Sequence, residues 1–149
     1  MSLFDQVSKD LIEAMKAKDK VRLQALRNVK KVFIEAKTAP GANDELSDDA
    51  ALKMIQKLVK QGKDSAQLFS EQNRPDLAEE ELAQVKAIEP YLPQQMDASE
   101  LETALRAIIA EVGATTAKDM GKVMGAASKQ LAGKADGKAI STMVKQLLG

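Results

Sequence analysis

The chain of 149 residues contains no cysteine, no histidine and no tryptophan. Without cysteine it can form no disulfide, no thiolate metal site and no thiol nucleophile. The absence of histidine removes the side chain that most often acts as an acid or base near neutral pH and ligates transition metals. With three Phe and one Tyr, the core has to be filled by aliphatic side chains and methionine. We therefore expect no metal site and no cofactor.

The sequence also lacks targeting and membrane-spanning signals. Residues 1–5 do not combine a basic start with an apolar run, as a secretory signal peptide does. No apolar run approaches the roughly 20 residues that a membrane-spanning helix requires. We therefore expect a cytoplasmic protein with no membrane partner. The sequence does not determine its oligomeric state.

The residues that are abundant are typical of α-helices. Ala, Leu, Lys, Glu and Gln dominate, and long alternating runs of β-branched residues are missing. Seven segments show helical periodicity, and each begins with a residue that suits a helix start. These residues are Ser2, Asp19, Ser47, Pro75, Asp97, Thr116 and Asp136. The sequence predicts an all-α fold.

Two prolines mark the expected domain boundary. Pro90 and Pro93 bracket Tyr91 and Leu92, and proline disfavours helical geometry in the residue before it. We predict a four-helix N-terminal domain over residues 1–93 and a three-helix C-terminal module over residues 94–149. A module of that size buries little apolar surface and is marginally stable alone.

Helical spacing also predicts which side chains face the core. The expected buried positions are Leu3, Phe4, Val7, Leu11, Ile12, Met15, Leu26, Val29, Phe33, Ala36, Leu52, Ile55, Val59, Gly62, Ala66, Phe69, Ala78, Leu82, Val85, Ile88, Leu101, Leu105, Ile108, Val112, Met120, Val123, Met124, Ala127, Leu131, Ile140, Met143, Val144 and Leu147. Gly62 within this pattern predicts either a close approach of a neighbouring helix or a kink.

Arg22 falls among apolar positions of the second segment, beside Leu26, Val29 and Phe33. An unpaired guanidinium is costly to bury. One interpretation is a structural ion pair with an acidic residue of another helix. The other is a buried or ligand-facing arginine in a cleft between the domains.

The last 37 residues carry an uneven charge. Six lysines stand against Asp119 and Asp136, a balance of +4, so the rest of the chain carries −4. On the sixth segment Lys118, Lys122 and Lys129 lie opposite the apolar side, and Gly121, Gly125 and Ser128 border them. Such a surface suits phosphate contacts, protein docking or plain solvation. It lacks the aromatic side chains that stack single-stranded bases.

No catalytic constellation is found in the sequence. Nucleophilic serine catalysis needs an adjacent base, and the serines here have no histidine. Gly133 and Lys134 are not preceded by the glycine spacing of a phosphate-binding loop. We predict no catalytic residue.

Several segments resemble those of a known family. They are D-K-V-R-L-Q-A-L-R (19–27), E-P-Y-L-P-Q-Q-M (89–96), G-K-V-M-G (121–125), K-Q-L-A-G-K-A-D-G-K (129–138) and M-V-K-Q-L-L (143–148). Together they resemble YqeY-like proteins and the C-terminal tail domain of the B subunit of the glutamyl-/aspartyl-tRNA amidotransferase. The chain has no counterpart of that subunit's large catalytic domain.

The resemblance implies kinship with a carbon–nitrogen ligase that takes glutamine as amido-N-donor, and an association with tRNA. The residues alone leave open whether the chain is an enzyme, and we expect a non-catalytic tRNA-associated module. The alternative is a protein-interaction adaptor with no RNA role. Neither the particular tRNA nor the protein partner follows from the sequence. The expected nucleic-acid-binding residues are Lys118, Gly121, Lys122, Gly125, Lys129, Gly133, Lys134 and Lys138.

Overall fold

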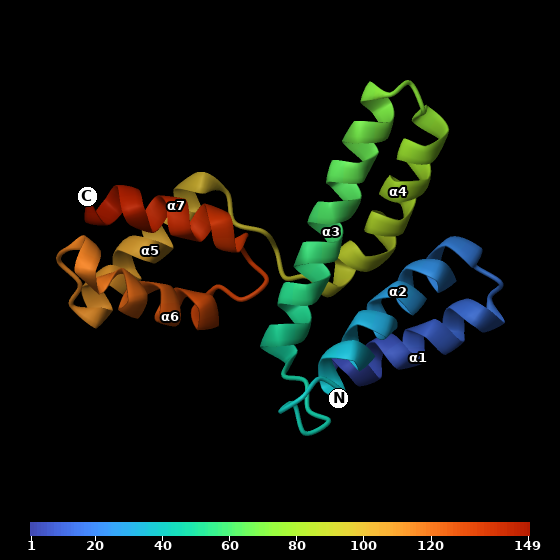
Figure 1. Ribbon diagram of the computed structural model, residues 1–149, viewed down its shortest axis with the longest axis horizontal. Helices are drawn as coiled ribbons and strands as arrows, with labels where there is room; N and C mark the ends of the chain where they lie inside the picture. Colours follow the sequence, from blue (N-terminus) through green and yellow to red (C-terminus); the bar gives the residue numbers. More distant parts are fainter. The chain divides into compact units, whose positions relative to one another are not determined.

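A computed structural model describes all residues from Met1 to Gly149. It contains seven α-helices, two short 3-10 helices and no strand, which confirms the predicted all-α fold. The Cα atoms group into two compact units, Met1–Leu92 and Pro93–Gly149 (Figure 1). Whether these units are independent domains with the predicted boundary stays a prediction.

The N-terminal unit consists of two helical hairpins. The first pairs α1 (Leu3–Lys16) with α2 (Lys20–Lys37), and the second pairs α3 (Asp48–Glu71) with α4 (Pro75–Ile88) (Figure 1). Helix α2 also packs against α4, which joins the hairpins. A 3-10 turn, η1 (Glu89–Tyr91), follows α4 where the sequence contains Pro90.

Three predicted N-caps of this unit are confirmed. The side chains of Ser2, Asp19 and Ser47 each accept a backbone N–H three residues later, at 3.1 Å. Pro75 is the first residue of α4, where its missing N–H costs no hydrogen bond. Local sequence thus determines where these four helices begin.

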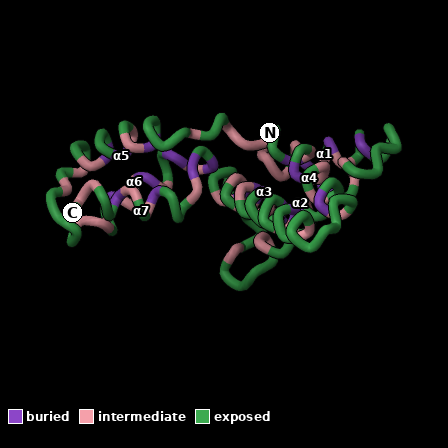
Figure 2. The backbone as a smooth tube through the Cα atoms, turned by 90° about the horizontal axis from the view of Figure 1, so that it is seen from above, coloured by how far each residue is buried: buried purple, intermediate pink, exposed green.

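The core of the unit is formed by buried side chains from all four helices (Figure 2). Its largest fully buried members are Phe33, Leu26 and Ile55. The predicted burial of Ile12, Met15 and Leu82 is wrong, because these side chains are 51%, 50% and 42% exposed. Helix α1 packs mainly against α2, so only a narrow stripe is buried. That stripe consists of Val7, Asp10 and Ala14.

Gly62 is buried where α3 packs against α4. A Cβ atom added to it would collide with a methyl group of Val85. Of the two interpretations of this glycine, the contact supports the close approach of a neighbouring helix, and α3 continues without interruption through it.

The C-terminal unit contains α5 (Ala98–Val112), η2 (Ala117–Asp119), α6 (Met120–Gln130) and α7 (Gly137–Leu148), and each α-helix packs against the other two. Helix α5 begins at the predicted Asp97, which forms a capping box with Glu100, and it ends at Gly113, which has a left-handed φ of 71°. The predicted helix start at Thr116 is corrected to a 3-10 turn, with α6 beginning at Met120.

The core of this unit is apolar. Its buried members are Leu101, Leu105, Ile108, Val123, Ala127, Leu131, Ala135, Ile140 and Val144. None of the helices in either unit has the length and apolar character needed to cross a membrane.

Candidate nucleic-acid interface

Helix α6 turns one side to the core and presents glycine and lysine on the other. Val123 and Ala127 are fully buried, whereas Lys122 and Lys129 are exposed. Residues seven apart lie on the same side of an α-helix, so these two lysines share one side of α6. Within α6 the apolar and basic residues therefore separate as the sequence predicts, although Lys118 lies outside this helix.

The two glycines of α6 face open space. Gly121 and Gly125 are exposed, and a Cβ atom added to either would meet no atom within 4 Å. Neither residue is needed for packing. Their missing side chains leave the helix backbone accessible beside Lys122 and Lys129.

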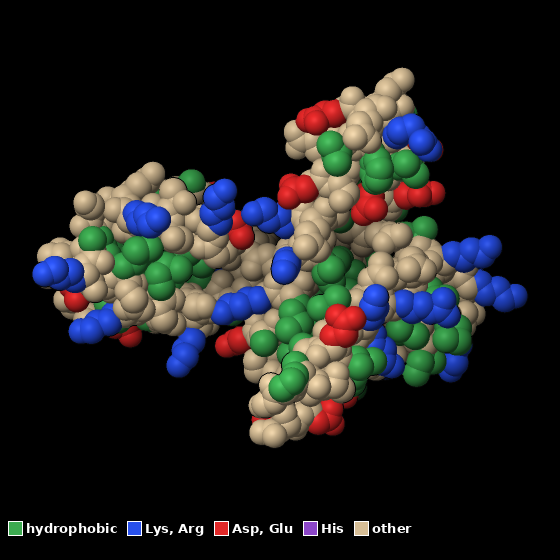
Figure 3. Space-filling view, viewed as in Figure 1, with side chains coloured by type: hydrophobic (Ala, Val, Ile, Leu, Met, Phe, Trp, Pro, Cys, Tyr) green, Lys and Arg blue, Asp and Glu red, His purple; other side chains and the backbone are tan.

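The other predicted lysines are exposed but come from different elements. Lys118 lies in η2, Lys134 in the turn after α6, and Lys138 in the first turn of α7. Of the eight predicted residues, α6 therefore carries Gly121, Lys122, Gly125 and Lys129. In the face seen in Figure 3, the basic side chains of this unit are spread out rather than gathered in one patch.

Gly133 has to be removed from the predicted surface. It is buried, with a left-handed φ of 74°, and its carbonyl accepts a hydrogen bond from Gln95 Nε2 at 2.6 Å. The neighbouring carbonyl of Lys134 accepts the backbone N–H of Met96 at 2.9 Å. Gly133 therefore serves the turn between α6 and α7, which holds the segment that leads into α5.

An acidic side chain lies close to the lysines at the start of α6. The Asp119 carboxylate accepts the backbone N–H groups of Thr115 at 3.0 Å and Thr116 at 3.4 Å. These hydrogen bonds lower the pKa of Asp119, and the charge of nearby Lys122 lowers it further. Lys122 thus has an anionic neighbour, which reduces the local positive potential.

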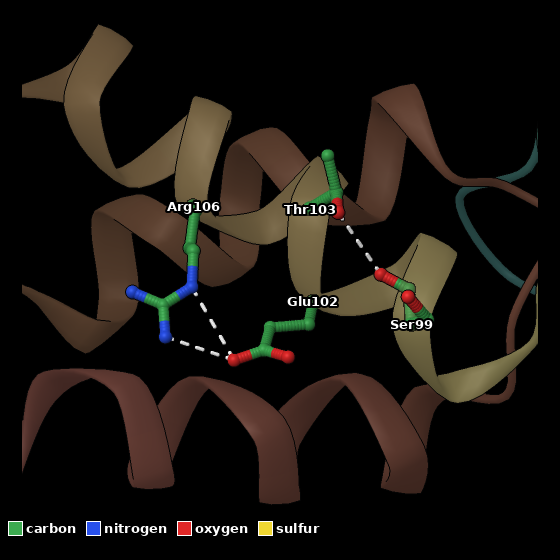
Figure 4. A network of polar contacts seen from close by, with 4 residues as sticks. All are labelled: Ser99, Glu102, Thr103 and Arg106. Carbon is green, nitrogen blue, oxygen red and sulfur yellow. Dashed lines mark hydrogen bonds and ion pairs between the residues drawn. The ribbon is translucent and has the colours of Figure 1, made fainter.

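The charge of this unit is divided between its helices. Seven basic residues stand against six acidic ones over residues 93–149, a balance of only +1, because residues 93–112 carry four acidic residues and Arg106. On α5, Arg106 donates to Glu102 at 2.8 Å, and Thr103 donates to the carbonyl of Ser99 at 3.1 Å (Figure 4). Arg106 is therefore already paired, and the other basic residues of this unit lie in η2, in α6, in α7 and in the turn between α6 and α7.

Arg22 of the N-terminal unit lies beside a buried carboxylate. Its guanidinium is 3.9 Å from Asp10 of α1, and its side chain is 37% exposed. This is the kind of contact that the structural interpretation of Arg22 predicts. Asp10 also accepts hydrogen bonds from Gln6 at 3.0 Å and from the Tyr91 hydroxyl at 2.5 Å.

Asp10 is a buried charged residue that is not among the residues predicted from the sequence. It is 8% exposed and is the one buried charged residue of the chain. Burial and the Asp10 carboxylate raise the pKa of Tyr91, while Arg22 opposes the shift. The spacing of Asp10 from Val7 and Ala14 places it on the buried side of α1, which is the signal that could have revealed it.

The N-terminal unit also has an open groove between α2, α3 and α4. Ser65 is the hydroxyl side chain that lines it, together with Glu81 and the amides of Asn28, Gln61 and Gln84. No lysine or arginine lines this groove, so Ser65 has no basic neighbour there to activate it. No group of three or more acidic side chains in the chain is arranged to hold a metal ion.

Comparison with known proteins decides the family. The sequence pattern of the Yqey-like protein family matches residues 4–148. The chain belongs to the YqeY-like family. This confirms the family resemblance that the short segments indicate, and it covers both compact units.

Three fungal relatives carry the name "Altered inheritance of mitochondria protein 41, mitochondrial". The one from Lachancea thermotolerans is 36% identical over 96 residues, which cover 64% of this chain and 51% of the relative. The one from Pyrenophora tritici-repentis is 28% identical over 145 residues, covering 94% and 77%. The one from Vanderwaltozyma polyspora is 30% identical over 121 residues, covering 76% and 64%. The chain thus matches about half the length of the first relative.

The names of these relatives contradict the predicted cytoplasmic location. All three are named as mitochondrial proteins. The prediction rests on residues 1–5 and on the lack of a membrane-spanning run, and the relatives extend beyond the region that they share with this chain. The composition of the shared helical region therefore does not indicate a compartment, and the cytoplasmic prediction is withdrawn.

Proposed function

We propose that this YqeY-like protein is a non-catalytic RNA-associated module that contacts folded RNA, tRNA in the first instance, through the exposed side of α6. The observation that carries the proposal is the pair of unpacked glycines, Gly121 and Gly125, beside Lys122 and Lys129. Glycine inside a helix costs about 1 kcal/mol relative to alanine. Since no packing contact offsets this cost, access to the backbone is a reason for its presence.

The chemistry of this surface fits a phosphate backbone. Lysine binds phosphate as a point charge, and a glycine ridge lets a sugar–phosphate chain approach the helix closely. Double-stranded RNA is recognised largely by shape and by backbone contacts, which need no aromatic side chains. The tRNA assignment comes from the resemblance to the amidotransferase tail domain, and α6 supplies the surface for it.

The charge balance limits the expected affinity. Because the C-terminal unit carries a balance of only +1, binding depends on local lysine contacts rather than on a strong overall field. Neutralising about three phosphates gives a slope of about −3 for the logarithm of the binding constant against the logarithm of salt concentration. We expect weak binding that falls steeply with salt.

A gel-shift series with total tRNA across ionic strength tests the proposal. Replacing Lys122, Lys129 and Lys138 with Glu should weaken binding at least about tenfold, because each contact to phosphate becomes a repulsion. The matched control replaces the exposed Lys20, Lys31 and Lys57 of the N-terminal unit with Glu. Equal loss in both triple variants, with helicity unchanged in circular dichroism, would show that α6 and α7 are not the contact surface.

A second candidate function is that of a protein-interaction adaptor. Exposed apolar side chains of the N-terminal unit, Ile12, Met15 and Ile34, favour it. A defined partner that stays bound after nuclease treatment and in high salt would distinguish it from the RNA-associated module, whose contacts are lost under both conditions.

A further inference from the structure

One side of α1 carries a regular stripe that the core does not fully cover. Phe4, Ser8, Leu11 and Met15 are spaced four, three and four residues apart, so they lie along one side of the helix. Phe4 and Leu11 are only half-buried against the core, and Met15 is 50% exposed. Ile12, beside this stripe, is 51% exposed. The stripe therefore borders the core, and Met15 is its exposed member.

Helix α2 carries a matching stripe. Its positions, spaced four, three, four and three apart, are Leu23, Arg27, Lys30, Ile34 and Lys37. The two stripes are neighbours, because the Lys37 ammonium lies 4.0 Å from the centre of the Phe4 ring. The α1–α2 hairpin therefore presents one continuous surface made by both helices, which we call the hairpin face.

The hairpin face combines apolar side chains with positive charge. Half-buried Leu11 and Leu23 pack against the core, and Met15 and Ile34 stand exposed. Arg27, Lys30 and Lys37 supply three basic groups, and none of the nine positions is acidic. Figure 3 shows hydrophobic side chains on this hairpin framed by Lys and Arg. Apolar contact and positive charge thus occur together here.

We propose that the hairpin face binds an amphipathic helix of a protein partner, with an apolar stripe flanked by Asp and Glu. Two antiparallel helices with residues at four- and three-residue spacing form ridges and a groove that accept a third helix. Met15 and Ile34 enter the apolar stripe of the partner, and Arg27 and Lys30 pair with its acidic flanks. The regular spacing along two helices favours a helix over a lipid surface. The exposed aliphatic side chains favour it over RNA, whose phosphates they cannot contact.

The experiment uses the full chain labelled with nitrogen-15 and a synthetic 18-residue helical peptide with Leu at every third or fourth position and Glu on both flanks. We expect saturable NMR shift changes that centre on the hairpin face. The same peptide with Lys in place of Glu should bind at least about tenfold more weakly, because its charge repels Arg27 and Lys30.

Two pairs of variants locate the site. Met15→Glu with Ile34→Glu, and separately Arg27→Glu with Lys30→Glu, should each weaken peptide binding at least about tenfold. The control Leu82→Glu changes an equally exposed apolar residue of α4 and should leave binding unchanged. The second pair alters charge alone, so it remains informative if the first pair disturbs folding.

Several results would overturn the proposal. No shift change at millimolar peptide, or equal binding of the Lys and Glu peptides, would exclude a helix of this chemistry. Shifts on the hairpin face with vesicles containing anionic phospholipid, or with tRNA, in the absence of peptide binding would assign the face to those ligands instead. The triple lysine variant of α6 and α7 should retain peptide binding, so the failure of the RNA proposal and that of this one are distinguishable.

Discussion

In the N-terminal unit, Gly62 is buried between α3 and α4, and a Cβ atom there would collide with Val85. In the C-terminal unit, Gly121 and Gly125 of α6 face open space. All three glycines lie within helices, Gly121 in the first turn of α6, and glycine lowers helix stability relative to alanine. The first cost is offset by close packing of two helices. The other two are not offset by any packing contact in the fold, and the RNA contact proposed for α6 would account for this difference.

The two units also differ in their interiors. The N-terminal unit buries Asp10 and binds it with Gln6, Arg22 and Tyr91, which come from α1, α2 and η1. The C-terminal unit buries apolar side chains only and positions its chain by capping and by the turn at Gly133. A buried polar network fixes one arrangement of the groups that it joins. In the N-terminal unit, that network holds Tyr91 of η1 against the hairpin formed by α1 and α2.

The largest expected effect is that of Gly62→Leu. The added side chain has to displace Val85, and overpacking of this kind costs about 3 kcal/mol. Urea unfolding should show the loss as a lower midpoint with an unchanged slope. Gly121→Leu is the matched control, because its side chain enters open space. Equal stability of both variants would contradict the packing role of Gly62.

Asp10→Ala should have the next largest effect. It leaves the Tyr91 hydroxyl and the Gln6 amide without their acceptor, and removing one partner of such a buried network costs about 2 kcal/mol. Thermal unfolding followed by circular dichroism measures the loss. Glu13→Ala, an exposed carboxylate of the same helix, serves as the control and should change stability little. A loss no greater than that of the control would show that the network does not stabilise the unit.

The alkaline titration of Tyr91 tests the same network through the ionisation of a single side chain. Burial and the Asp10 carboxylate raise its pKa above the ordinary value of about 10. The pKa of Tyr91 is raised in the folded state only, so the neutral hydroxyl contributes to the stability of the fold. That contribution is fully present below about pH 10 and is lost as the pH rises toward the folded pKa. Tyr91 is the one tyrosine, so absorbance at the tyrosinate band reports it alone.

Removing the negative charge should move that titration. In Asp10→Asn the pKa of Tyr91 should fall, because the tyrosinate no longer meets a carboxylate. An unchanged titration curve would mean that burial alone holds the hydroxyl neutral.

Local sequence predicted the features that depend on local interactions. Ser2, Asp19, Ser47 and Asp97 cap helices where the sequence places them, because a cap involves residues only a few positions apart. The left-handed Gly113 that ends α5 is likewise a feature of the local chain. The all-α fold follows from these starts together with helical periodicity.

Features that depend on neighbours distant in sequence could not be predicted in the same way. Met15 and Leu82 suit a core by periodicity, yet no helix covers them. Gly133 resembles a surface glycine in sequence, but Gln95 reaches its carbonyl from 38 positions away. The side of α6 was predicted correctly because apolar and charged residues separate cleanly on it. Which ligand it contacts depends on chemistry outside the chain.

The smallest expected change in the free energy of unfolding is a gain rather than a loss, and it bears most directly on function. Gly121→Ala and Gly125→Ala should each stabilise the protein by about 0.5–1 kcal/mol, because alanine favours the helix and its methyl group meets no atom. If α6 contacts RNA through its backbone, the same variants should weaken tRNA binding although every lysine remains. Urea unfolding and the gel-shift series measure the two quantities on one sample. A gain in stability without a loss of binding would show that the glycines are not part of the contact, and would leave the lysines as a solvated face.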